Sequence, residues 1–134
     1  MAFEFYKSMI KPNAPEMIWK PATTSETYKV GETLKTSSDG KLTKASGTDV
    51  PEYVCSADYV APASNAGDLP VTEINGGQIY RVPLQAAGTS LKVGDKVTIH
   101  TDGLQVTATT TSGVAEIVKI EGTAVGNYVQ VHLA

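Results

Sequence analysis

The side chains best suited to chemistry in this sequence are one cysteine and two histidines, Cys55, His100 and His132. A zinc site requires His or Cys ligands at short, regular spacing, and none of the three has such a companion. A reactive thiolate requires a nearby His or basic cluster, and the run YVCSA around Cys55 contains neither. We therefore expect a small buried cysteine, two strand histidines that face solvent, and no bound metal.

The motifs that carry hydrolytic and phosphate chemistry are also missing. No serine stands in a Gly-x-Ser-x-Gly elbow, and the sequence has neither a Walker loop nor a Gly-x-Gly-x-x-Gly run. Asp95 and Asp102 are candidates for a carboxylate pair. Each, however, adjoins a glycine in a turn, where aspartate commonly accepts hydrogen bonds from the local backbone. We expect no catalytic residue, no cofactor and no enzymatic activity.

Composition and charge exclude several further classes of function. The chain has 134 residues and a formal net charge of −3, with acidic and basic residues mixed along it. This charge provides no basic footprint for nucleic acid. The single cysteine precludes an intrachain disulfide. No stretch approaches the roughly 18 apolar residues of a membrane span, and charged residues interrupt the first twenty, so we expect neither a membrane partner nor a signal peptide.

Short runs between turn signals predict an all-β fold. From Tyr28 onward, glycines and Asp-Gly pairs bound runs of about five to eight residues, the spacing of short strands. Threonine and valine suit a half-buried strand, and the run at 127–133 alternates apolar and polar residues. We predict one β domain over 23–134, a small β-barrel or sandwich of short antiparallel strands.

Asp-Gly and Asn-Gly pairs predict where the hairpins lie. Glycine accepts the positive φ that tight hairpin turns require. We therefore expect hairpin turns at 39–40 and 102–103. The run NGG at 75–77 predicts a third hairpin, which would join 69–74 to 78–84.

Part of the sequence recurs at an offset of 63 residues. The run KVGE at 29–32 matches KVGD at 92–95, and an Asp-Gly pair follows each run at the same spacing. A shared order of turn, strand, hairpin and strand predicts two related β units. This internal pseudo-repeat would cover about 28–59 and 91–121.

Residues 1–22 differ from the rest of the chain and form the candidate binding segment. Prolines interrupt an apolar and aromatic run there, so neither a helix nor a central strand is expected. We predict an extended N-terminal arm that is separate from the β domain. Its aromatic residues either dock on another chain or fold back to protect an edge strand. The candidate partner-binding residues are Phe3, Phe5, Tyr6, Ile18 and Trp19.

Three runs follow the arm: GDLPV at 67–71, GQIYRVP at 77–83 and VGDKV at 93–97, before the Asp-Gly hairpin at 102–103. With the arm, this arrangement resembles the head decoration (capsid cement) proteins of tailed bacteriophages and related prophage structural proteins. The resemblance implies a non-enzymatic virion protein that binds the outside of a phage capsid and stabilises it. It also implies the major capsid protein as partner, a homotrimer, assembly in the host cytoplasm, and the arm as the capsid contact.

Two alternatives remain open on the sequence. One is a phage tail structural protein, since the resembling segments are turns and strands that other phage β modules share. The other is a β-barrel module that binds a carbohydrate or a peptide, with Tyr53, Tyr59 and Tyr80 as its platform. An exposed aromatic strip on one sheet face, beside a pocket, would favour this second alternative.

Overall fold

The computed structural model describes residues 2–8, 16–75 and 77–133, and these residues form strands and turns without a helix. The strands are β1 Glu4–Ser8, β2 Met17–Pro21, β3 Thr27–Tyr28, β4 Thr33–Thr36, β5 Leu42–Lys44, β6 Tyr53–Cys55, β7 Tyr59–Val60, β8 Asp68–Glu73, β9 Gln78–Pro83, β10 Lys96–Val97, β11 Ala115–Ile120 and β12 Tyr128–His132. The fold is all-β, as the turn spacing predicts.

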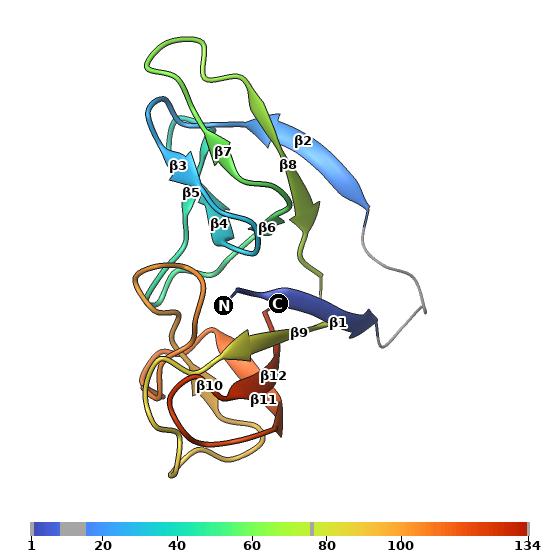
Figure 1. Cartoon of the computed structure of the whole chain (residues 1–134), viewed down its shortest axis with the longest axis vertical. Coiled ribbons are helices and arrows are strands. Elements are labelled where there is room, and N and C mark those ends of the chain that lie inside the picture. Colours follow the sequence, from blue (N-terminus) through green and yellow to red (C-terminus); the bar gives the residue numbers. More distant parts are fainter. Residues whose placement is uncertain (1, 9–15, 76, 134) are drawn as a thin grey trace.

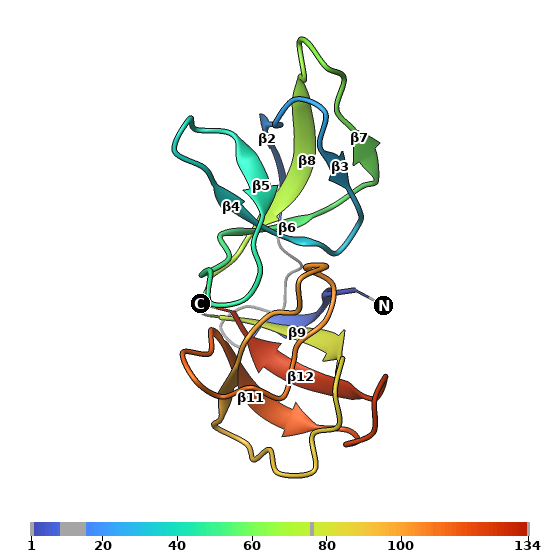
Figure 2. The same cartoon turned by 90° about the vertical axis from the view of Figure 1, so that its left-hand side faces the viewer.

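Two five-stranded antiparallel sheets divide the molecule into an upper and a lower half (Figure 1; Figure 2). Sheet A, in the lower half, has the strand order β1-β9-β12-β11-β10. Sheet B, in the upper half, has the order β2-β8-β6-β4-β5, and the pair β3-β7 lies beside it. The sheets are not closed into a barrel, so the sandwich alternative of the sequence prediction is the one observed.

Each half has its own hydrophobic core. The core of the upper half includes Tyr28, Leu34 and Leu69, which lie between sheet B and the β3-β7 pair. The core of the lower half gathers the inward side chains of sheet A, Phe3 near the start of the chain, and Val54 from β6 of sheet B. Because Val54 points into the lower core, sheet B contributes to both cores.

Two of the turns and the alternation predicted from sequence are present. The Asp-Gly pair at 102–103 turns the chain between Ile99 and Val106, which form an antiparallel bridge. The Asp-Gly pair at 39–40 joins β4 to β5, which pair in antiparallel register. In the last strand, Val129, Val131 and Leu133 are buried on one face, as predicted. Local turn chemistry and strand periodicity therefore determined these elements.

The predicted hairpin at 75–77 is wrong. The two runs that it would join are β8 and β9, which belong to different sheets. Leu69 and Val71 of β8 pack in the upper core, whereas Tyr80 and Val82 of β9 pack in the lower core. The chain therefore crosses between the halves here, because each run buries its apolar face in a different core. Gly76 itself lies outside the described residues.

The N-terminal segment is extended, but it does not stand apart from the β domain. β1 pairs with β9 at one edge of sheet A, and β2 pairs with β8 at one edge of sheet B. Phe3 is 3% exposed and belongs to the lower core. Residues 1 and 9–15 of the predicted arm lie outside the described residues. The separate arm is thus replaced by two edge strands, because Phe3, Phe5 and Ile18 gain free energy by packing in or against the two cores.

The two sheets share a pattern of hydrogen bonds that follows the sequence similarity between 29–32 and 92–95. The N–H of Gly31 donates to the C=O of Cys55 (2.8 Å), and the N–H of Gly94 donates to that of Ile117 (2.8 Å). The strand order β2-β8-β6-β4 in sheet B corresponds to β9-β12-β11-β10 in sheet A. Among the described residues, β1 is therefore an additional strand of sheet A without a counterpart next to β2 in sheet B.

Gly31 and Gly94 occupy matching turns, yet only one of them touches the N-terminal strand. Both have positive φ, 82° and 98°. A Cβ at Gly31 would meet the Cβ of Ala2 and the carbonyl of Phe3, whereas a Cβ at Gly94 would meet nothing within 4 Å. The tight approach of residues 2–3 to the turn thus depends on the missing side chain at Gly31.

Substituting alanine at each of these glycines should separate backbone strain from the cost of displacing the N-terminus. Gly94→Ala should lower the free energy of unfolding by about 1–2 kcal/mol, the cost of a left-handed residue. Gly31→Ala should cost about 1–3 kcal/mol more, because the added methyl also overpacks against residues 2–3. Urea denaturation of the two variants checks this, and equal losses would show that the N-terminus does not depend on the Gly31 turn.

Candidate interaction surface

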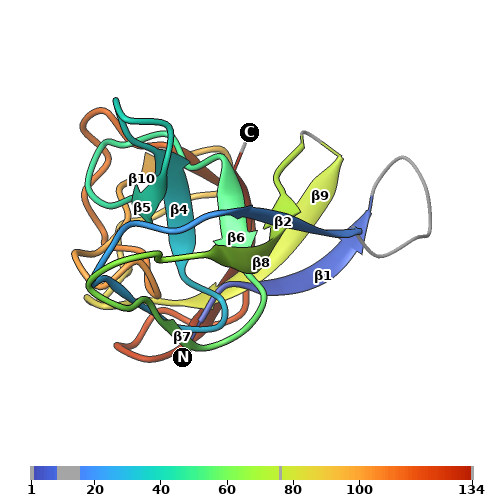
Figure 3. The same ribbon diagram turned by 90° about the horizontal axis from the view of Figure 1, so that it is seen from above.

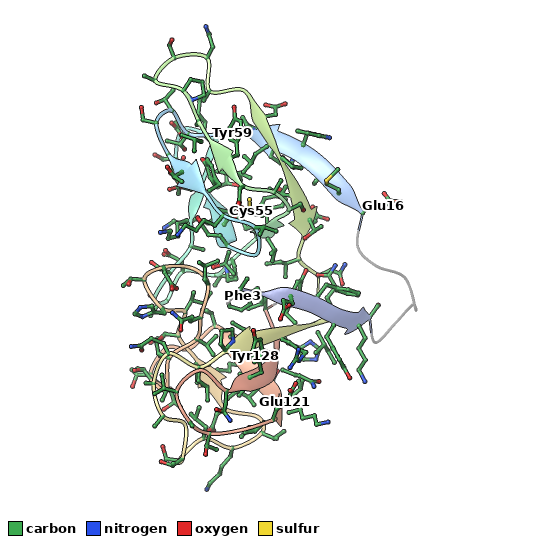
Figure 4. The ribbon with its side chains drawn as sticks, in the orientation of Figure 1. Phe3, Glu16, Cys55, Tyr59, Glu121 and Tyr128 are labelled. Carbon is green, nitrogen blue, oxygen red and sulfur yellow. The ribbon has the colours of Figure 1, made fainter. Side chains whose placement is uncertain are left out.

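The five candidate partner-binding residues do not all face solvent. Phe3 lies at the junction of the two halves, and its N–H donates to the C=O of Gly31 (3.0 Å) (Figure 4). Phe5 is half-buried, with its ring edge-on to Tyr80 at a centroid distance of 6.0 Å. Ile18 is half-buried against the upper core. Phe3 belongs to the core, so its assignment as a partner contact is a correction to the sequence prediction.

Three large side chains of β1 and β2 are exposed. Tyr6 is 48% exposed, Met17 is 54% exposed and Trp19 is 60% exposed. β1 and β2 both reach the same side of the molecule, one from each half (Figure 1; Figure 3). Met17 was not singled out from the sequence, although its alternation with Ile18 and Trp19 in an extended run would have placed it on the face of Trp19. We refer to Tyr6, Met17 and Trp19 as the exposed edge residues.

A cluster of polar side chains lies on the outer face of sheet A, and sequence reasoning missed it. Arg81 donates two hydrogen bonds to the carboxylate of Glu121, from Nε (2.9 Å) and Nη2 (2.8 Å). Gln130 donates to the same carboxylate (2.9 Å), and the Arg81 guanidinium lies 4.4 Å from the ring centre of Tyr128. The hydrogen bonds from Arg81 and Gln130 lower the pKa of Glu121 to about 2. These residues come from three adjacent strands or their ends, so only strand pairing brings them together.

The cluster forms the floor of a shallow hollow of about 480 Å³ next to β1. Its lining residues are Glu4, Phe5, Tyr6, Arg81, Lys119, Glu121 and Gln130. The two hydrogen bonds between Arg81 and Glu121 restrict the orientation of both side chains. The hollow therefore presents a polar surface beside Tyr6, in which the carboxylate of Glu121 is already paired with Arg81 and Gln130.

The three tyrosines considered as a ligand platform do not form one. Tyr80 is 1% exposed and packs in the lower core. Tyr59 and Tyr53 are half-buried against the upper core. The hydroxyl of Tyr59 donates to the C=O of Ala66, and the Lys20 ammonium lies 5.6 Å from the ring centre of Tyr53. Since the rings belong to two different cores, the platform predicted for the ligand-binding alternative is wrong.

Cys55 and His132, which the sequence offered as candidates for chemistry, make local contacts within the fold. Cys55 is buried, its thiol contacts the C=O of Ala57 (3.0 Å), and burial raises the pKa of this thiol to about 11. A thiol with this pKa is protonated at neutral pH and is a poor nucleophile. Nδ1 of His132 lies 3.1 Å from the C=O of Gln78. In the part of the chain that the structure describes, no three His, Cys, Asp or Glu side chains gather as metal ligands.

The two turn aspartates hydrogen-bond to their own turns, as their glycine neighbours predict. Asp95 accepts from the N–H of Lys92 (2.9 Å), and Asp102 accepts from the N–H of Leu104 (2.9 Å). Each carboxylate therefore stabilises its own turn through these contacts. Within the described ranges, no helix is long and apolar enough to cross a membrane.

Comparisons with known proteins identify a similar fold. No family model matches the sequence, and no curated protein matches it. Among solved structures, the chain is similar to the head fiber gp8.5 N base of bacteriophage phi29, with a TM-score of 0.55 and 18% sequence identity. The match covers 89% of this chain and 95% of the phage chain. At this identity the likeness concerns the fold, and nearly the whole of each chain takes part in it.

Proposed function

We propose that this chain is a non-enzymatic structural protein of a bacteriophage virion, which binds the outside of the capsid and stabilises it. The observation that carries the proposal is the likeness in fold to the phi29 head fiber base over 89% of the chain. The resemblance of the runs at 67–71, 77–83 and 93–97 to capsid decoration proteins points to the same class of protein. The proposed site of action is the capsid surface, after assembly in the host cytoplasm.

The proposed partner is the major capsid protein, and the proposed contact is formed by the exposed edge residues. Tryptophan and tyrosine are the side chains that most often dominate the energy of protein interfaces, because they bury a large area with few rotatable bonds. Tyr6 and Trp19 are exposed in the free chain, so they are accessible for such a contact. Phe5 and Ile18 support the two strands from beneath, by packing on Tyr80 and on the upper core.

A homo-oligomer, and specifically a trimer, is part of the proposal. Each chain would present one set of exposed edge residues to the capsid. Three sets on one particle bind together, so that a modest contact per chain becomes a strong collective one. Sedimentation velocity of the purified protein tests the trimer directly.

Trp19→Ala should weaken attachment to capsids without unfolding the protein. Truncation of a buried interface tryptophan costs about 2 kcal/mol or more, which is roughly a thirtyfold loss per site. Co-sedimentation with expanded capsids measures attachment, and a thermal melt of each variant shows whether it is folded. The matched control is Val125→Ala, a residue that is 65% exposed but lies outside β1 and β2. Attachment of the Trp19 variant equal to that of wild type would remove Trp19 from the contact.

A further inference from the structure

β2 is an edge strand whose outward backbone groups can be identified from the neighbouring hydrogen bonds. In the described residues it pairs only with β8, where Trp19 lies opposite Pro70. The C=O of Pro70 accepts from the N–H of Ser56 (3.0 Å), so the backbone groups of Pro70 point toward β6. Trp19 therefore turns its own N–H and C=O away from β8 and toward the open side of the sheet. The N–H of Ala22 donates to Gly67 (2.9 Å), which fits the same alternation along the strand.

The internal similarity identifies β9 as the counterpart of β2. Trp19 pairs with Pro70 of β8 as Arg81 pairs with Gln130 of β12. Arg81 also lies opposite Glu4, because β1 covers the side of β9 that corresponds to the open side of β2. The described residues thus contain the same edge twice, once covered by an antiparallel strand and once open.

The covered edge indicates the chemistry of a strand that would fit the open one. On β9, Phe5 of β1 lies opposite Tyr80, and their rings meet edge-on at 6.0 Å. The residue of β2 that corresponds to Tyr80 is Ile18, which pairs with Val71 as Tyr80 pairs with Val131. A strand on β2 would therefore place an apolar side chain opposite Ile18. Directly opposite residues of this kind stabilise antiparallel pairs.

Two further residues limit which segment fits the open edge. Lys20 carries the one charge within β2, so an acidic side chain opposite it would be favoured. Pro21 ends the strand and lacks an N–H, and Pro83 occupies the corresponding position of β9. Prolines at these positions confine strand pairing to a short stretch, as is common for edges that must not pair indiscriminately.

We propose that the open edge of β2 binds an extended segment of the capsid partner as an added antiparallel strand, with an apolar residue opposite Ile18 and an acidic residue opposite Lys20. This inference rests on the proposed function, since it names how the partner is held there. Main-chain hydrogen bonds to Trp19 and Met17 supply the binding energy, and the side-chain pairs supply the register. The indole ring of Trp19 then lies beside the added strand, on the exposed face of sheet B.

A pair of substitutions at one position distinguishes strand addition from docking of the side chain alone. Trp19→Ala and Trp19→Pro both remove the indole ring, but only proline also removes the outward N–H. Because that N–H does not point to β8, proline is compatible with this position of an edge strand. We expect Trp19→Pro to attach to expanded capsids about tenfold more weakly than Trp19→Ala, the effect of one lost hydrogen bond that leaves its acceptor unpaired. Equal attachment of the two folded variants would overturn strand addition and leave the proposed function standing.

Hydrogen exchange of the wild-type protein provides a measurement that does not depend on the folding of a variant. On capsids, the amides of Met17 and Trp19 should exchange at least tenfold more slowly than in the free protein, because both would be hydrogen-bonded. Unchanged exchange at these two amides in capsid-bound protein would also overturn the inference.

A peptide with the sequence of residues 2–8 and the change Phe3→Glu tests the edge without capsids, since the same segment pairs with β9 and the change places an acidic residue opposite Lys20. Chemical shift changes confined to β2 and its neighbours, present in Trp19→Ala and absent in Trp19→Pro, would support the edge as a strand acceptor. If the peptide binds in this way but the wild-type protein does not attach to capsids, the proposed function is overturned. The edge of β2 would still be an acceptor for an added strand. Concentration-dependent association of the wild type that Trp19→Pro abolishes would identify a second copy as the occupant and overturn the assignment to the capsid partner.

Discussion

Replacing Phe3 with alanine should lower the free energy of unfolding by about 3–5 kcal/mol, the usual cost of truncating a buried phenylalanine. Phe3 is 3% exposed and packs with Tyr80, Val82 and Val54 in the lower core. Its neighbours come from both sheets, so the cavity left by truncation would lie where the two halves meet. Since a domain of this size has a total stability of about 5–15 kcal/mol, the loss is a large fraction of it. Urea denaturation followed by far-ultraviolet circular dichroism measures the change.

Tyr6→Ala is the matched control, because it removes another aromatic ring from the adjoining strand β1. Tyr6 is 48% exposed, so its loss should cost about 1 kcal/mol or less. Similar losses for the two variants would show that Phe3 is not a core residue. Deleting residues 1–21 removes Phe3 and both edge strands, β1 and β2, and should leave a chain that no longer unfolds cooperatively. This reverses the expectation for a separate arm, whose removal would leave the melting temperature nearly unchanged.

Glu32 should make the protein less stable as the pH rises toward neutrality. Its side chain is 2% exposed, Oε1 accepts a long hydrogen bond from the N–H of Lys29 (3.4 Å), and Oε2 has no partner among the described residues. Burial raises the pKa of this carboxyl from 4.5 to about 7, against the opposing attraction of Lys44. The folded state therefore holds the proton more tightly than the unfolded chain does.

The sign of the effect follows from this raised pKa. Below pH 4.5 the carboxyl is protonated in both states, and the protonated form is the one that the folded state favours. As the pH rises from 4.5 to about 7, the unfolded chain ionises first and stability is lost. The difference in pKa corresponds to a loss of roughly 3 kcal/mol, at about 1.4 kcal/mol for each pKa unit.

Glu32→Gln removes the titrating group and should remove this part of the pH dependence. The stability of the variant relative to wild type should increase by up to roughly 3 kcal/mol between pH 4.5 and pH 7.5. The measurement is a series of urea denaturation curves for both proteins across this range. If the free energies of unfolding of the two proteins change with pH in parallel, the carboxylate of Glu32 is solvated or paired in the folded state.

The elements that the sequence predicted correctly depend on local backbone conformation. The Asp-Gly pair at 39–40 forms the hairpin between β4 and β5 because glycine accepts the positive φ of the turn, 82° at Gly40. The alternation over 127–133 places Val129 and Val131 on a buried face because side chains on a strand alternate with a period of two. Such features depend only on residues that are adjacent along the chain, so they can be predicted from the sequence.

The tertiary structure alone decided which strands pair and which aromatic residues remain outside. β8 and β9 follow one another across an Asn-Gly-Gly run, yet they join different sheets, because their apolar faces pack into different cores. Phe3 and Trp19 look alike as anchors in the sequence, but Phe3 is buried and Trp19 is 60% exposed. Strand pairing and burial depend on contacts between segments far apart in the chain, and the sequence of one segment does not specify its distant partner. For the same reason the Arg81–Glu121 pair, 40 residues apart, and the open edge of β2 could be recognised only from the assembled sheets.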